Sequence, residues 1–320
     1  MKRMLFIMAT AMLLPFAEAG IRPFGAEERV AFLGDSITHG GGYVADLQVA
    51  WKVRHPESRP VFLNAGIGGD TAKRGFERIE TDLVPMRPDR VVVMFGMNDV
   101  NTGRAYFEEW MEKLCDALDA KGWKVDLMTP TPYDEWNTNL TAKITKARQE
   151  PALGDCAAFV RELAAKRGYG LVELHDPLVR ILKEHPERRY LGDRVHPGEP
   201  GDRVIASRIL EAAGEGKVDP DTVVPKELVV ARNRLLDVQQ KRRTLAEYER
   251  MMRDYGVDLN DREAVFARLD KRLEGLRKAI SAADAKWHEG RQNKFKNELY
   301  GRGAELEAQE EAARRAIGEL

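Results

Sequence analysis

The sequence predicts an α/β fold in which helices cover both faces of a parallel sheet, followed by a C-terminal α-helical extension. Between about residues 29 and 213, short apolar runs alternate with longer amphipathic stretches. The runs are almost continuously apolar, which is typical of parallel strands that are buried on both faces. After about residue 214 the strand signal ends, and long, highly charged helical patterns follow.

The first 19 residues have the pattern of a secretory signal peptide. Lys2 and Arg3 precede the apolar run 4–14, and Ala17 and Ala19 supply a small-residue cleavage site. The run is well short of the ~20 apolar residues that span a bilayer. We therefore expect cleavage after Ala19, a periplasmic or secreted protein, and no stable membrane insertion of the mature chain.

Five apolar runs are the predicted strands, and the segments between them show helical periodicity. Because ligands bind at the carboxyl ends of the strands in such sheets, the residues directly after each run are candidates for a site. The strands are expected at 30–33, 61–64, 91–95, 125–128 and 171–174, with helices at about 106–121 and 156–167.

The C-terminal region is predicted to be an α-helical hairpin or a three-helix unit. Helices are expected at about 226–255 and 290–317. Between them, apolar residues recur at steps of four and three, which predicts a helical seam. The expected domains are a signal peptide at 1–19, a catalytic α/β domain at 20–213 and the extension at 214–320. A packing role, a lid and a surface for homo-oligomer formation all stay open for the extension. The seam residues are Leu269, Leu273, Leu276, Ile280, Ala283 and Trp287.

Charge and cysteine content limit the classes of partner. The chain has 51 basic and 52 acidic residues, whereas nucleic-acid binding usually needs a basic excess. Cys115 and Cys156 form a disulfide or remain two buried thiols, and the sequence leaves both readings open. No histidine or cysteine spacing indicates a metal site and no phosphate loop is present, so we expect neither a metal nor another cofactor.

Polar residues that suit ester hydrolysis follow the predicted strands. The reaction needs a nucleophilic hydroxyl, an imidazole that accepts its proton, and a carboxylate that orients the imidazole. Ser36 follows the first strand and is the candidate nucleophile. His196 is the candidate base, and Asp193, three residues earlier, is placed to orient it.

Donors for a developing oxyanion are also present. The candidates are the backbone N–H of Ser36, the backbone N–H of Gly69 after the second strand, and the side-chain amide of Asn98 after the third. The alternative for Ser36 is a plain helix cap. The only other serines after residue 19 are Ser58, Ser207 and Ser281, and none of them follows a predicted strand.

These residues resemble the four signature blocks of the SGNH, or GDSL, hydrolase family. The blocks are Gly34-Asp35-Ser36, Gly69, Gly96-x-Asn98-Asp99 and Asp193-x-x-His196, in the family's order. The resemblance covers about residues 29–213. It implies a three-layer α/β/α, flavodoxin-like sandwich. It also implies a Ser36–His196–Asp193 triad and an oxyanion hole of Ser36, Gly69 and Asn98.

We therefore expect an exported serine esterase that acts through an acyl-enzyme on a small-molecule or glycan ester. The pattern is similar to bacterial carbohydrate esterases, which implies removal of acetyl groups from carbohydrates. His39, Tyr133 and Trp136 are candidate substrate contacts. An equal alternative is a satisfied loop histidine for His39 and packing for the two aromatics. The alternatives for the whole chain are a lysophospholipase or thioesterase for longer acyl chains, and a scaffold built on the helical tail.

Overall fold

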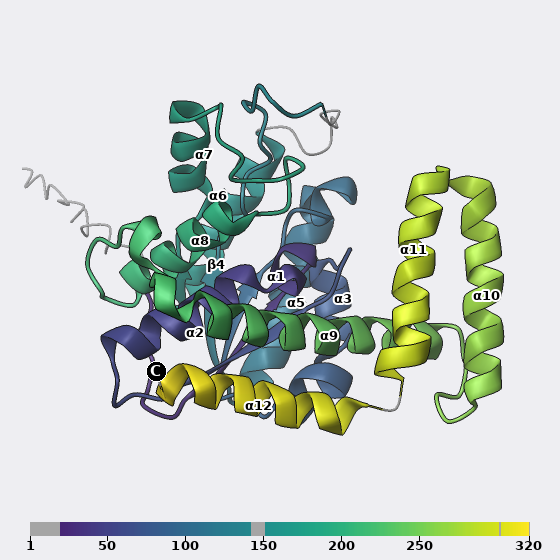
Figure 1. Cartoon of the computed structure of the whole chain (residues 1–320). Helices are drawn as coiled ribbons and strands as arrows, with labels where there is room; N and C mark the ends of the chain where they lie inside the picture. The colour runs from purple at the N-terminus through teal and green to yellow at the C-terminus, as the bar shows by residue number, and fades with distance from the viewer. Residues whose placement is uncertain (1–19, 142–150, 301, 320) are drawn as a thin grey trace, which may run out of the picture.

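A computed structural model describes residues 20–141, 151–300 and 302–319 of the chain. The predicted signal peptide lies outside these residues. Within them, the α/β region is organised around one five-stranded sheet (Figure 1). No helix in the described part of the chain is long and apolar enough to cross a membrane.

All five strands are parallel, in the order β2-β1-β3-β4-β5. This confirms the predicted sheet. Gly34 at the end of β1 lies in register with Gly66 of β2 and Met94 of β3, so three adjacent loops leave one edge together. The strands are β1 (Arg29–Gly34), β2 (Val61–Gly66), β3 (Arg90–Met94), β4 (Lys124–Met128) and β5 (Gly170–Val172).

Successive strand residues point to opposite faces of the sheet, and each face is buried by helices. Phe32 and Val92 pack on one side, in a core with residues of α2, α7 and α8. Leu33 and Val93 pack on the other, with residues of α5 and α6. The predicted three-layer arrangement is therefore confirmed. The helices of this region are α1 (Ser36–Gly40), α2 (Gly42–Arg54), α3 (Ala72–Glu77), η1 (Ile79–Leu83), α4 (Val84–Met86), η2 (Asp99–Asn101), α5 (Arg104–Ala120), α6 (Ala152–Arg167), α7 (His175–Glu184) and α8 (Glu199–Ala212).

The C-terminal extension shares the core of the α/β layers. Leu235 of α9 and Ile317 of α12 belong to the same apolar cluster as Phe32. Figure 1 shows α9 and α12 side by side along these layers, while α10 and α11 stand away from them. The extension comprises η4 (Pro220–Thr222), η5 (Lys226–Leu228), α9 (Val229–Asp254), α10 (Arg262–Ala279), α11 (Ala282–Lys294), η6 (Phe295–Leu299) and α12 (Gly303–Glu319).

The seam predicted to run unbroken through residues 269–287 is wrong. The chain leaves the helix at Ile280, which is extended, and Ser281 starts a new helix by accepting a hydrogen bond from the Asp284 N–H. A serine followed three residues later by an acidic residue is a capping signal that outweighs the apolar spacing. Trp287 is consequently 57% exposed. The helix expected at 290–317 is also divided, because the chain turns at Tyr300 between η6 and α12.

Cys115 and Cys156 are two free thiols rather than a disulfide. Both are buried in the apolar cluster on the α5 and α6 face of the sheet. Burial raises the pKa of each thiol to about 12, so neither carries a thiolate near neutral pH.

Candidate active site

Ser36 lies at the first turn of α1, directly after β1. The helix cap at this point is Asp35, whose Oδ1 accepts a hydrogen bond from the Ile37 N–H at 2.9 Å. Gly34 is required here because a Cβ at this position would meet Thr38 Oγ1 at 2.3 Å and the Met94 carbonyl at 2.9 Å. The capping role is therefore filled by Asp35, and the Ser36 hydroxyl points to another partner.

That partner is His196. The Ser36 Oγ lies 2.7 Å from His196 Nε2, and His196 Nδ1 lies 2.7 Å from Asp193 Oδ2. Because the carboxylate can only accept, Nδ1 carries the proton and Nε2 is left to accept from the Ser36 hydroxyl. The structure thus brings together the three side chains that the sequence predicted as a triad, although residues 36 and 196 are far apart in the chain.

The loop that carries His196 is held by a tight turn before α8. Asp193 Oδ1 accepts from the backbone N–H groups of Val195, at 3.1 Å, and His196, at 2.8 Å. Burial works against the charge on Asp193, but these bonds and His196 outweigh it and hold its pKa well below the ordinary value. Asp193 is therefore ionised throughout the neutral range and keeps His196 in one tautomer.

Arg194 is a supporting residue that sequence reasoning missed. Its φ of 76° lies in the left-handed region, which costs a residue with a Cβ roughly 1–2 kcal/mol. Its buried guanidinium donates to the carbonyls of Asp134 and Leu140, each at 2.7 Å. The backbone between Asp193 and His196 is thereby anchored to the loop after β4. No sequence motif marks an arginine for this role.

The loops after β2 and β3 are joined beside Ser36. Gly69 has a φ of 74°, a conformation that glycine adopts without strain, and a Cβ added there would meet nothing within 4 Å. Asn98 donates from Nδ2 to the carbonyl of Asp70, the residue after Gly69, at 2.9 Å. The Ile67 N–H donates to the Gly34 carbonyl at 3.1 Å. The two predicted oxyanion residues therefore lie on loops that contact each other and the Ser36 loop.

Two buried carboxyl groups support these loops. Asp99 accepts from the N–H groups of Ala72, at 2.9 Å, and Gly96, at 3.1 Å, and so ties the β2 loop to the β3 loop. Burial raises the pKa of Asp35 to about 7 and that of Asp99 to about 6, and neighbouring carboxyl groups add to both shifts. Asp35 thus caps α1, and Asp99 joins the loops after β2 and β3.

Arg78 is a second supporting residue that the sequence did not indicate. Its guanidinium is almost fully buried and donates to the carbonyls of Gly34, at 3.2 Å, and Ala65, at 2.6 Å. It also donates to Asp70 Oδ2 at 2.7 Å. It fixes the ends of β1 and β2 against the loop that follows Gly69, and its place in the amphipathic segment after β2 gave no signal of this.

The three predicted substrate contacts lie in different surroundings. His39 lies in the last turn of α1, with its Nδ1 3.6 Å from Oε2 of Glu247 on α9, and burial followed by nearby arginines lowers its pKa to about 3. Tyr133 is buried in the core. Trp136 is half-buried, with Lys183 Nζ 4.9 Å from its ring centroid.

The arrangement can pass a proton from Ser36 to His196 at an open surface. The side chain of His196 is 46% exposed and that of Asp193 is 57% exposed. In the residues that the structure describes, no group of three or more His, Cys, Asp or Glu side chains is placed to hold a metal ion. The chemistry offered is that of a hydroxyl nucleophile with a positioned base.

Comparison with known proteins gives a consistent picture. The model of the GDSL-like Lipase/Acylhydrolase family matches residues 32–204. An acetylxylan esterase of Geobacillus stearothermophilus is 26% identical over 216 residues, which are 59% of this chain and 95% of that one. An uncharacterized lipoprotein of Bacillus subtilis is 32% identical over 139 residues, which are 39% of this chain and 57% of that one.

Solved structures show the same fold. An acetyl xylan esterase structure from Geobacillus stearothermophilus has a TM-score of 0.53 and 25% identity, and covers 61% of this chain and 99% of that one. A gut microbial diltiazem-metabolizing enzyme has a TM-score of 0.74 and 17% identity, and covers 94% of this chain and 96% of that one. The second likeness is of fold alone, and it extends over the C-terminal helices.

Proposed function

Because this chain belongs to the GDSL-like lipase/acylhydrolase family and is a carboxylic ester hydrolase, we propose that it is a serine esterase that works through an acyl-enzyme. The observation that carries the proposal is the continuous hydrogen-bond path from Ser36 Oγ through His196 to Asp193, with both distances at 2.7 Å. A hydroxyl, a base and an orienting carboxylate in this order are the parts of a catalytic triad.

In the proposed reaction, Ser36 Oγ attacks the ester carbonyl carbon while His196 Nε2 takes the hydroxyl proton. The imidazolium is stabilised by the ionised Asp193, and it returns the proton to the alkoxide as the alcohol leaves. A water molecule, deprotonated by His196, then attacks the acyl-enzyme and releases the acid and Ser36.

The proposed oxyanion donors come from three loops. They are the backbone N–H of Ser36, the backbone N–H of Gly69 and the side-chain amide of Asn98. The contacts of Asn98 with Asp70 and of Ile67 with Gly34 support this, because they hold the loops in one place before substrate arrives. Loss of one preorganised donor of this kind costs roughly 10²–10³ in kcat.

For the substrate, we propose a small acyl group, acetyl above all, on a carbohydrate. The acetylxylan esterase relative supports this choice. The exposure of His196 and Asp193 also supports it, because a bulky glycan needs an open approach to the ester. His39 and Trp136 remain the proposed contacts with the rest of the substrate, whereas the burial of Tyr133 favours packing for that residue.

We also propose that residues 1–19 direct export and are removed, leaving residues 20–213 as the hydrolase and 214–320 as its extension. The arrangement of Lys2, Arg3, the apolar run and Ala17-x-Ala19 supports this. The lipoprotein relative is a further, weaker support.

The test is hydrolysis of p-nitrophenyl esters from acetate to dodecanoate, followed by acetyl release from acetylated xylo-oligosaccharides. Ser36→Ala should lower kcat/KM at least 10³-fold with an unchanged melting temperature. Ser58→Ala is the matched control, because Ser58 lies before β2, at the opposite end of the sheet, and should keep full activity. A maximum on long chains would replace the acetyl proposal with a lipid-directed one, and full activity of Ser36→Ala would overturn the mechanism.

A further inference from the structure

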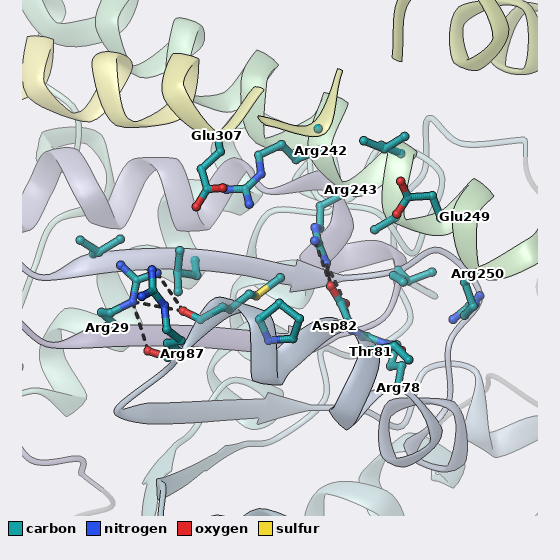
Figure 2. Close-up of a pocket in the computed structure, with 18 of the residues that line it drawn as sticks. Arg29, Arg78, Thr81, Asp82, Arg87, Arg242, Arg243, Glu249, Arg250 and Glu307 are labelled. Carbon is teal, nitrogen blue, oxygen red and sulfur yellow. Dashed lines mark hydrogen bonds and ion pairs between the residues drawn. The ribbon is translucent and has the colours of Figure 1, made fainter. Parts of the chain in front are cut away.

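A large polar cleft lies away from Ser36, where α9 and α12 cross the edge of the sheet. Its volume is about 530 Å³, and it is bounded by β2, by η1 and α4, and by the facing sides of α9 and α12. Figure 2 shows Arg29 and Arg87 at one end of the cleft and Arg78 and Arg250 at the other. We call it the arginine cleft, because nine arginines line it: Arg29, Arg78, Arg87, Arg242, Arg243, Arg250, Arg253, Arg314 and Arg315.

The carboxylates of the cleft are too few to balance these cations. Four of them line it: Asp82, Glu249, Glu307 and Glu311. Asp70 and Glu310 lie just outside and also pair with lining arginines. Counting all six carboxylates still leaves three arginines in excess.

Part of the charge has a structural explanation. Arg243 donates to both oxygens of Asp82, at 2.9 and 3.0 Å, and Arg78 donates to Asp82 at 2.6 Å. Arg242 and Arg314 share Glu310. These pairs join α9 to the α/β layers and to α12. Arg250 pairs with Asp70 and Arg315 with Glu311, so six of the nine lining arginines have a carboxylate partner.

Three arginines have no such explanation. Arg29, Arg87 and Arg253 form no ion pair with any residue that the structure describes. Arg29 donates to the backbone carbonyls of Met86, at 2.8 Å, and Arg87, at 3.1 Å, and Figure 2 shows both arginines at this end of the cleft. Arg253 lines the cleft from α9, and burial raises the pKa of Glu249 on the same helix, although Arg253 and Arg243 oppose this shift.

The positive charge of the cleft also affects the pKa of Arg314, which is one of the lining residues. Burial lowers its pKa, and the neighbouring Arg242 and Arg29 lower it further, although Glu310 opposes them. Its Nε–H is buried and has no hydrogen-bond partner among the described residues. A buried donor without a partner costs about as much as a lost hydrogen bond, and an acceptor in the cleft would remove that cost.

From this we infer that the arginine cleft binds a multivalent anion, a molecule that carries several carboxylate or phosphate groups. Guanidinium groups bind both kinds of oxyanion in bidentate geometry. The lining arginines are spread along the cleft, from Arg29 and Arg87 at one end to Arg250 at the other (Figure 2). A ligand with several charged groups can therefore contact more of them than one small ion can.

The lining also limits the ligand. The described residues that line the cleft include no aromatic side chain. Stacking on a sugar or base is therefore not part of the recognition, and charge with hydrogen bonding carries it. The site is separate from ester cleavage, so binding is measured without turnover.

The experiment is isothermal titration of the full-length mature protein at low and at physiological salt. The probes are tripolyphosphate and trigalacturonate, with inorganic phosphate and neutral xylotriose as comparisons. We expect one site per chain for a trivalent probe, at least tenfold tighter than for phosphate, weakened by salt, and no binding of xylotriose. The tighter of the two trivalent probes identifies the source of the charge as phosphate or uronic acid.

Two variants decide whether the cleft is responsible. Arg87→Gln with Arg253→Gln removes two exposed arginines that form no ion pair within the described part of the chain, so folding should be preserved, and binding should fall at least tenfold. Arg180→Gln is the matched control, because Arg180 is exposed on α7, outside the cleft, and should bind as the wild type does. Equal binding by the double variant, equal binding of phosphate and the trivalent probes, or no binding of either trivalent probe would overturn the proposal.

Discussion

At the carboxyl edge of the sheet, Ser36 and His196 meet as partly exposed side chains on short loops. Beneath α9, by contrast, Arg78 and Arg243 meet Asp82 as buried charges. The side chains of His196 and Asp193 are exposed to solvent, and a turn formed by neighbouring residues positions them. The buried charges join α9 to segments more than 150 residues earlier in the chain.

This difference predicts different consequences of mutation. An exposed charge pair contributes little to stability, so the triad can be altered without unfolding the protein. A buried charge that loses its partner is costly, because the remaining ion is not solvated. Variants of the triad should therefore lower kcat without changing stability, and variants of the buried charges under α9 should lower the free energy of unfolding.

The largest expected effect is on rate, at Asp193. Asp193→Asn keeps the shape of the side chain but removes the charge that holds the Nδ1 proton of His196. We expect kcat to fall about 10³–10⁴-fold, with a melting temperature within 2–3 °C of the wild type. Steady-state hydrolysis and calorimetry measure the two quantities. Asp221→Asn, at an exposed position of η4, is the control. If Asp193→Asn also lowered the melting temperature well beyond this range, the triad would not differ from the buried charges under α9.

The triad was predictable because its chemistry is local in the sequence. Gly34-Asp35-Ser36 and Asp193-x-x-His196 are each contiguous, and the apolar runs before them predict parallel strands, so their meeting follows from topology. The supports of the site were not predictable. Arg78 and Arg194 act through carbonyl groups that any residue type supplies, and so the sequence contains no complementary partner to search for.

The sequence also predicted only part of the structure of the C-terminal extension. Its helices were predictable from periodicity, but the contacts of α9 were not. Nothing in the sequence distinguishes Arg232 from the other charged residues of its helix. In the structure it is buried and donates to Asp46 Oδ1 at 2.5 Å. The break at Ser281 also escaped notice, because the apolar spacing continues across it while the capping serine ends the helix.

The second prediction concerns this buried charge. Arg232→Met should lower the free energy of unfolding by about 3–5 kcal/mol, because it leaves Asp46 buried without its partner. Burial and the neighbouring Asp46 already raise the pKa of Asp202 to about 8, while Arg232 opposes this shift. Loss of the Arg232 charge therefore destabilises the ionised forms of both carboxyl groups. Urea denaturation measures the loss. Arg234→Met, on the exposed face of the same helix, should change stability by less than 0.5 kcal/mol. If the two variants were equally stable, α9 would not be held by its buried charges.

The last prediction concerns Asp35, which lies at the carboxyl edge of the sheet but is buried, as the charges under α9 are. Its pKa of about 7 in the folded protein is above the ordinary value of 3.8, because of burial first and then of Asp99 and Asp70, while His196 opposes them. Between about pH 4 and 7 the unfolded chain is ionised at this position and the folded chain keeps the proton, so unfolding releases it. The stability contributed by the protonated carboxyl is therefore complete below pH 4 and is lost as the pH rises towards 7, at no more than about 1.4 kcal/mol per pH unit.

Asp35→Asn isolates this contribution. Asparagine caps a helix as well as aspartate does, so the bond from the Ile37 N–H should survive. The variant should gain stability relative to the wild type as the pH rises from 4 to 7, with no further change above 7. Urea denaturation from pH 4 to 8 measures the difference, which cancels the titration of groups common to both proteins. A difference that stays constant with pH would mean that Asp35 is ionised in the folded protein, as an exposed residue of the edge would be. The edge would then hold a buried charge of its own, and it would differ less from the group of buried charges under α9.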